Sequence, residues 1–176
     1  GYRAATYKFS RNTLDILVDH GIDYDASLFG DDVPYLLQND RGSVVELPSH
    51  YGLDDWPHFQ FSRELQTTLP IKSTQQAMQV FTEEFDAAWT FGGLWISVWH
   101  PFLSGRLARA AAIAKLIEYM HDKGQVWFAT LAEISAHIRG VIDRGEWSPR
   151  VDQLPYYEGP IPELGHCEPT NVVPPK

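Results

Sequence analysis

The sequence has very little cysteine, with Cys167 the only one among 176 residues. A single cysteine excludes an intrachain disulfide and a metal site built from a cysteine cluster. Basic residues are also scarce, because 14 Lys and Arg stand against 23 Asp and Glu and leave a formal net charge of −9. Nucleic acids and anionic membranes are bound through basic patches, so we expect neither as the main partner.

Long apolar runs and nucleotide-binding glycine motifs are missing as well. No segment reaches the roughly 18 consecutive apolar residues of a membrane span, and no signal peptide is visible. No Gly-x-Gly-x-x-Gly, Walker loop, Gly-x-Ser-x-Gly or His-Glu-x-x-His occurs. We therefore expect a cytoplasmic protein without a membrane partner. Its hydrophobic content of 44% is typical of a folded domain.

The stretch from residue 73 to residue 144 alternates between helical and extended patterns. Capping boxes at Ser73 and Thr130 predict helices over 74–90 and 131–143, and an alanine-rich pattern predicts a third over 105–121. Apolar runs at 94–99 and 125–129 lie between them and predict buried strands. This alternation predicts an α/β fold with parallel strands joined by helices.

The first 61 residues predict smaller elements. A helix is expected over 13–20, an extended piece over 22–27, and a hairpin formed by 34–37 and 43–47. The loop 48–61 is rich in aromatic and ionisable residues, which indicates either a site wall or a hydrophobic cluster beneath a long loop. We expect one domain over 1–146, followed by a proline-rich extended tail over 147–176.

Candidate catalytic residues lie near the ends of the predicted strands. His100 ends the 94–99 run, Asp54 and Asp55 follow the 43–47 strand, and Arg3 follows a short extended start. Parallel strands would bring these ends to one rim, where active sites collect. A histidine held in one tautomer by a carboxylate, with an arginine nearby, is a workable acid–base set. The alternative is a histidine that only caps a strand.

Several residues are candidates for contacting a ligand. Trp56 lies in the aromatic loop, and Trp99 either lines a pocket or fills the core. Arg106 comes at the start of a helix, where the dipole disfavours a cation, so it either binds a carboxylate or forms ordinary salt bridges. The seven histidines include no closely spaced pair of metal ligands.

An ordered series of short motifs carries a family resemblance. The motifs lie at 1–4, 21–28, 30–35, 46–48, 53–57, 100–101, 105–106, 126–130 and 133–134. In this order the sequence resembles the polysaccharide deacetylase superfamily, the carbohydrate esterase family four type. Within it, the sequence is similar to the branch of allantoinase-, cyclic-imidase- and peptidoglycan-deacetylase-like hydrolases.

The resemblance implies the C-terminal half of a distorted (β/α) barrel and hydrolysis of a non-peptide C–N bond in an amide, cyclic amide or N-acetyl group. It implies His100 as the general acid, Asp54 or Asp55 as the residue that orients it, and Arg3 as the arginine that holds a catalytic aspartate. Ala5 replaces a proline that is usual in the family. The candidates for substrate binding are Trp56, Trp99, Arg106 and Tyr35.

The first two motifs of the family are missing, since neither Thr-Phe-Asp-x-Asp nor His-x-x-x-His occurs. The resemblance therefore implies that the N-terminal half of the barrel is missing or separate, and we expect a second chain to carry it in a higher oligomer. We expect a divalent metal such as zinc in the complete site, with no ligand in this chain, and a small amide or an acetylated sugar as substrate. The alternative is a non-catalytic subunit that binds a carbohydrate or a ureide.

Overall fold

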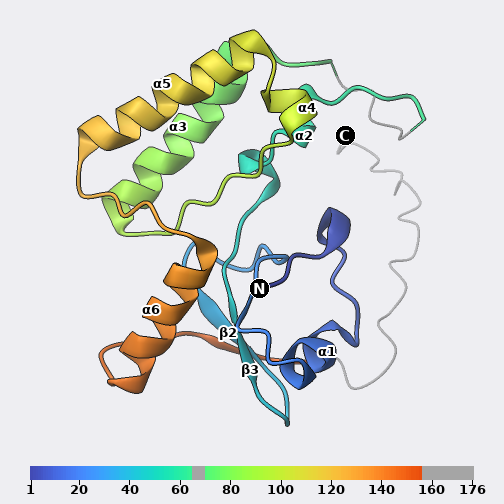
Figure 1. Cartoon of the computed structure of the whole chain (residues 1–176), viewed down its shortest axis with the longest axis vertical. Coiled ribbons are helices and arrows are strands. Elements are labelled where there is room, and N and C mark those ends of the chain that lie inside the picture. The colour runs from blue at the N-terminus through green and yellow to red at the C-terminus, as the bar shows by residue number, and fades with distance from the viewer. Residues whose placement is uncertain (65–69, 156–176) are drawn as a thin grey trace, which may run out of the picture.

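A computed structural model describes residues 1–64 and 70–155 (Figure 1). The helices are α1 (Thr13–Asp19), α2 (Trp56–Phe59), α3 (Thr74–Phe91), α4 (Pro101–Ser104), α5 (Leu107–Lys123) and α6 (Leu131–Asp143). The strands are β1 (Tyr24–Asp25), β2 (Tyr35–Gln38), β3 (Ser43–Glu46) and β4 (Val151–Gln153), and two short 3₁₀ helices are η1 (Ala5–Tyr7) and η2 (Tyr51–Leu53).

The four strands form one mixed sheet in the order β1-β3-β2-β4. β2 and β3 form the predicted hairpin and are antiparallel, whereas β1 runs parallel to β3 and β4 runs parallel to β2. Asn39 closes the hairpin turn, because its side-chain oxygen accepts the backbone N–H groups of Arg41 and Gly42 at 3.0 and 2.9 Å.

The sheet lies between α1 and α6 (Figure 1). Successive residues of a strand point to opposite faces. Val44 accordingly packs with Leu14 and Leu17 of α1, and Val45 belongs to the cluster that includes Ile134 and Ile138 of α6. The alternation of this short strand thus fixes a helix on each face.

A second hydrophobic core lies between α3 and α5, which run side by side (Figure 1). It contains Phe81 and Phe85 from α3 and Leu116 and Met120 from α5. The predicted helices are confirmed here. Both capping boxes form, at Ser73 with Gln76 and at Thr130 with Glu133, and α3 ends at Gly92 in the left-handed conformation.

The two predicted buried strands are wrong for the described chain. Residues 94–99 make one isolated bridge, between Val98 and Asp54, and residues 125–129 form no strand. Ile96 is the one buried residue of 94–99, while Trp127 and Phe128 are 58% and 47% exposed. A strand needs a neighbouring strand for its backbone groups. Beyond that bridge, the described residues supply 94–99 with single bonds, from the N–H of Leu94 to the carbonyl of Asp32 at 3.0 Å and from the hydroxyl of Ser49 to the carbonyl of Ile96 at 2.9 Å. The α/β class is confirmed, but the connection of parallel strands by helices is not observed.

β4 lies within the predicted tail 147–176 and adds an edge strand to the sheet. The N–H of Leu154 donates to the carbonyl of Gln38 at 2.8 Å and extends this pairing. Residues 156–176 of the tail lie outside the described residues, so the division at residue 146 stays a prediction. Among the described residues, no helix combines the length and apolar character needed to span a membrane.

Candidate active site

The candidate site forms where the loop after β3 meets the segment before α4. The N–H of Val98 donates to the carbonyl of Leu53 at 2.8 Å, and the N–H of Asp55 donates to the carbonyl of Val98 at 3.0 Å. These two backbone bonds place His100 beside Asp55, although 45 residues separate them in the sequence.

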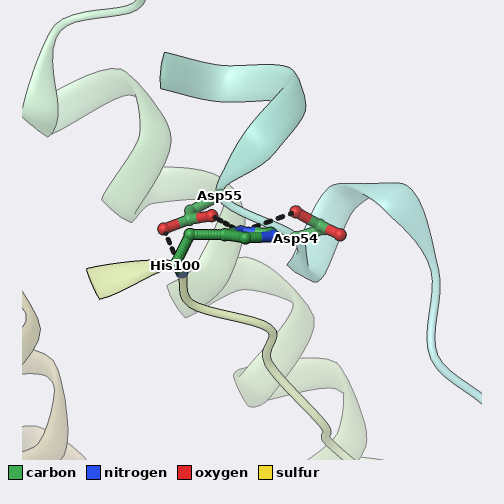
Figure 2. Close-up of side chains that lie close together, drawn as sticks. All are labelled: Asp54, Asp55 and His100. Carbon is green, nitrogen blue, oxygen red and sulfur yellow. Dashed lines mark hydrogen bonds and ion pairs between the residues drawn. The ribbon is translucent and has the colours of Figure 1, made fainter. Parts of the chain in front are cut away.

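Asp55 is a fully buried acceptor for His100. Its Oδ1 lies 2.6 Å from His100 Nδ1, and its Oδ2 accepts the backbone N–H of His100 at 2.9 Å (Figure 2). The hydroxyl of Ser104, on α4, also donates to Oδ2. One carboxylate therefore fixes both the ring and the backbone of the histidine.

This contact sets the tautomer of His100. A carboxylate oxygen only accepts hydrogen bonds, so Nδ1 carries the hydrogen and Nε2 is left for other chemistry. The side chain of His100 is 32% exposed, so solvent or a ligand can reach it. Between the two predicted candidates, Asp55 is the residue that orients His100, because Asp54 Oδ1 lies 3.9 Å from the same nitrogen.

Asp54 is held by different partners. Its Oδ1 accepts the backbone N–H of Trp56 at 2.8 Å, and its Oδ2 accepts the hydroxyl of Tyr7 at 2.5 Å. Burial and the hydrogen bond to Asp54 raise the pKa of Tyr7, so this phenol stays a donor. Sequence reasoning missed Tyr7, because its position depends on positive φ angles of 54° and 59° at Thr6 and Tyr7.

Two aromatic rings flank the imidazole of His100. The ring centres of Trp56 and Phe102 lie 5.2 and 5.8 Å from it, both in edge-to-face arrangements. Trp56 is a predicted site residue, and the structure does bring it to His100. Phe102 was not predicted, although its place two residues after His100 was a usable signal; it is 57% exposed.

Tyr35 and Arg106 lie apart from this centre, whereas Trp99 lines a hollow together with His100. Tyr35 is 1% exposed and packs in the core beneath α1, and Arg106 is an exposed residue just before α5. Trp99 packs against Phe81 and Trp95 in the α3–α5 core. Nothing in the described structure joins these three side chains to His100 by a hydrogen bond or ion pair.

A hollow of about 910 Å³ is lined by Trp99 but not by His100, Asp54 or Asp55. Arg3 lines it, together with the extended segments 94–99 and 125–129 and parts of α3 and α6. The guanidinium carbon of Arg3 lies 5.9 Å from the centre of the Tyr7 ring, whose hydroxyl binds Asp54. Arg3 is thus connected to the candidate site through Tyr7.

The loop 48–61 both supports the core and borders the site. His58 is buried, with Nε2 2.8 Å from the carbonyl of Gly52 and Nδ1 2.9 Å from Nζ of Lys72. Burial lowers the pKa of His58, so a structural role suits it. Trp56 of the same loop contacts the ring of His100. The loop therefore contributes residues both to the packing beneath it and to the candidate site.

Comparison with known proteins points to one family. A structure described as a polysaccharide deacetylase from Mycobacterium smegmatis matches 89% of this chain at 34% identity and a TM-score of 0.79. A peptidoglycan deacetylase of Helicobacter pylori is 26% identical over 77% of the chain. The chain is a relative of the polysaccharide deacetylases. The predicted family resemblance is thereby confirmed.

The match to the deacetylases is partial in length. The chain spans 55% of the Helicobacter protein and 53% of the Mycobacterium chain. It also spans 49% of a peptidoglycan deacetylase-like protein of Gibberella zeae, to which it is 25% identical. No protein-family model matches the chain. This chain therefore corresponds to about half of each deacetylase that it resembles.

The deacetylase resemblance implies a divalent metal, and one group of described residues could offer ligands. Atoms of Asp54, Asp55 and His100 lie within 4.8 Å of one another. However, Asp55 Oδ1 and His100 Nδ1 are only 2.6 Å apart and hydrogen-bonded, so an ion between them would have to break that bond. Asp55 Oδ2 already has two donors. As arranged, the group suits orientation of His100 rather than metal binding.

Proposed function

We propose that this chain forms part of a hydrolase that removes acetyl groups from N-acetylated sugars, with His100 as the general acid. The observation that carries the proposal is the contact between Asp55 and His100. A buried carboxylate that holds Nδ1 leaves Nε2 of a partly exposed imidazole to deliver a proton. The names of the relatives, which are peptidoglycan and polysaccharide deacetylases, favour an N-acetyl group over a cyclic amide.

The proton transfer assigned to this chain can be written atom by atom. Protonated His100 gives the hydrogen on Nε2 to the amide nitrogen as the C–N bond of the tetrahedral intermediate breaks. The products are a free amine and acetate, and His100 is left neutral with its other hydrogen still donated to Asp55. The negative charge of Asp55 stabilises the imidazolium before transfer.

The rings of Trp56 and Phe102 have two roles in this proposal. Their contacts with the imidazole limit its rotation, so Nε2 keeps one direction. Phe102 is exposed and stands beside His100, where an aromatic ring can cover the apolar face of a sugar. Trp56, Phe102 and His100 would thus form one wall of the substrate site.

The remaining parts of the site belong to a second half, which we propose to be a separate chain or a further segment of a longer one. Two observations support this. The chain spans about half of its relatives, and two extended apolar segments, which make one isolated bridge at Val98 among the described residues, line the 910 Å³ hollow. Strands of the other half would pair with 94–99 and 125–129 and complete the predicted barrel, covering Trp127 and Phe128.

We propose that the metal ligands lie in that half, because the Asp-Asp-His group here is already hydrogen-bonded. When bound, a divalent metal supplies an activated water and polarises the acetyl carbonyl. Arg3 lines the hollow and is placed to hold a carboxylate from the other half. The higher oligomer and the cytoplasmic location stay predictions.

The proposal is tested with the protein produced together with the sequence that completes it. Acetate release is measured on oligomers of N-acetylglucosamine and on a cyclic imide. We expect acetate from the sugar, and a loss of at least about 100-fold in His100→Ala. His20→Ala removes an exposed histidine at the end of α1 and should leave the rate unchanged. Sugar binding without acetate release would instead support the non-catalytic alternative.

A further inference from the structure

Two carboxyl side chains meet inside the sheet, away from the His100 site. Asp25 on β1 and Glu46 on β3 are opposite each other in the parallel pairing, and both are 0% exposed. Isolated carboxylates are almost never buried without a cation or several donors. This pair therefore needs an explanation that the proposed proton transfer by His100 does not supply.

The hydrogen bonds of the pair are unequal. Asp25 accepts the N–H of Ser27 at 2.9 Å and its hydroxyl at 2.8 Å, one on each carboxyl oxygen. Glu46 Oε1 accepts the N–H of Leu28 at 2.9 Å, but its Oε2 has no donor among the described residues. Its neighbour is Asp25, another carboxyl group. Two carboxyl groups can hydrogen-bond only if one of them carries a proton.

The charges around the pair also indicate that one of the two carboxyl groups is protonated. Burial, followed by the hydrogen bond with Asp25, raises the pKa of Glu46 to about 10, although Arg3 acts in the opposite direction. Tyr35, from β2, is the cross-strand partner of Glu46 and is not a cation. Asp15 of α1 lies next to the core residue Leu14, but its carboxylate is bound by Arg41 and Asn39. Arg3 is the described cation that acts on Glu46.

The same network fixes the backbone on both sides of Arg3. Tyr2 pairs with β1 through two bonds, from its N–H to the carbonyl of Tyr24 at 2.9 Å and from the N–H of Ala26 to its carbonyl at 3.0 Å. The N–H of Ala4 donates to the hydroxyl of Ser27 at 2.7 Å, and that hydroxyl donates to Asp25. The path therefore runs from Ala4 through Ser27 to the carboxyl pair.

We propose that Asp25 and Glu46 share one proton and, through Ser27, act as a positioning pair that fixes Arg3 at the edge of the hollow. With one proton shared, the pair carries a single negative charge, and Arg3 is a cation that acts on it. Arg3 consequently keeps its place in the hollow lining, available to an anion. The functional part of this inference rests on the proposed function, because it takes Arg3 as a site residue.

The shared proton is tested by carboxyl ¹³C NMR of the full-length protein over pH 4 to 10. We expect one carboxyl, assigned through Glu46→Gln, to stay protonated at pH 7, and Asp25→Asn to change its titration. Glu83→Gln, an exposed position on α3, is the matched control. If both Asp25 and Glu46 titrate below pH 6, the shared proton is overturned.

The positioning role is tested by hydrogen exchange of the Ala4 amide and by kinetics. Ser27→Ala should speed exchange about tenfold, as expected for loss of one buried hydrogen bond. Glu46→Gln keeps a neutral hydrogen-bonding side chain and should preserve both protection and kcat, whereas Glu46→Leu should lower kcat about tenfold with KM unchanged. In an Arg3→Gln background, Glu46→Leu should have no further effect.

Unchanged Ala4 exchange in Ser27→Ala, or additive effects of Glu46→Leu and Arg3→Gln, would overturn the positioning role. The carboxyl titration and the hydrogen-exchange measurement do not require enzyme turnover. If the full-length protein releases no acetate from any N-acetylated sugar, the proposed function fails, while the titration and the exchange still decide whether the pair shares a proton and fixes the Arg3 segment.

Discussion

Replacing Asp55 by asparagine should abolish the acid function of His100 while largely preserving the fold. The amide oxygen can take the place of Oδ2 and keep the bonds from the His100 N–H and the Ser104 hydroxyl. The amide NH₂ then faces Nδ1, which lies 2.6 Å from the wild-type oxygen. Two donors cannot bond, so neutral His100 must move its hydrogen to Nε2.

The magnitude follows from what the imidazolium loses. Its charge-assisted bond to Asp55 is worth about 1.5–3 kcal/mol, and leaving Nδ1–H against another donor costs about 1–3 kcal/mol more. The sum of about 2.5–6 kcal/mol corresponds to a rate loss of roughly 10²- to 10⁴-fold, since about 1.4 kcal/mol is tenfold. A neutral imidazole with its hydrogen on Nε2 is a far weaker acid than the imidazolium.

The assays are the rate of acetate release and the ¹⁵N shifts of the His100 ring, which distinguish the two neutral tautomers. Asp54→Asn is the matched control, because the Tyr7 hydroxyl can reverse and accept from the new NH₂ while Trp56 keeps its bond. We expect a much smaller loss in that control. Full activity of Asp55→Asn, or a ring that keeps its hydrogen on Nδ1, would refute the reasoning.

Three further predictions concern stability and metal. The pKa of Glu46 is raised to about 10 in the folded state, from 4.5 in the unfolded chain. Its contribution to stability therefore falls as pH rises between these values, by at most about 1.4 kcal/mol per pH unit. The free energy of urea unfolding of Glu46→Gln, measured from pH 5 to 9, should depend less on pH than that of wild type, and an unchanged slope would contradict this. Tyr7→Phe leaves one oxygen of Asp54 without its donor and should lower the free energy of unfolding by about 1–3 kcal/mol, whereas Tyr51→Phe, in the same ring cluster, should not. Chelation of divalent metal should leave the urea midpoint of this chain unchanged, and a clear decrease would assign metal ligands to it.

Features set by neighbouring residues could be predicted from the sequence. The capping boxes at Ser73 and Thr130 and the turn at Asn39 depend on local hydrogen bonds, and all three form. The segments 94–99 and 125–129 carry the composition of buried strands, but strand formation needs a partner, and the described chain contains none apart from the bridge at Val98. Composition therefore identified apolar extended segments and misjudged their pairing.

The candidate site was also predicted only in part from the sequence. The sequence placed His100, Asp54, Asp55 and Trp56 in one site, and the structure brings these residues together. The sequence could not show whether Asp55 or Asp54 orients His100. That depends on the bond from the Asp55 N–H to the carbonyl of Val98, which places the Asp55 carboxylate beside Nδ1 of His100. Tyr7 was missed because two successive positive φ angles carry its ring to Asp54.

The most direct test of the central claim is the rate of acetate release by His100→Ala, compared with wild type, in the complete enzyme on an N-acetylated sugar. We expect a fall in kcat of at least about 100-fold with little change in KM, because His100 acts when the C–N bond breaks. Turnover within a few-fold of wild type would contradict the role of His100 as the general acid.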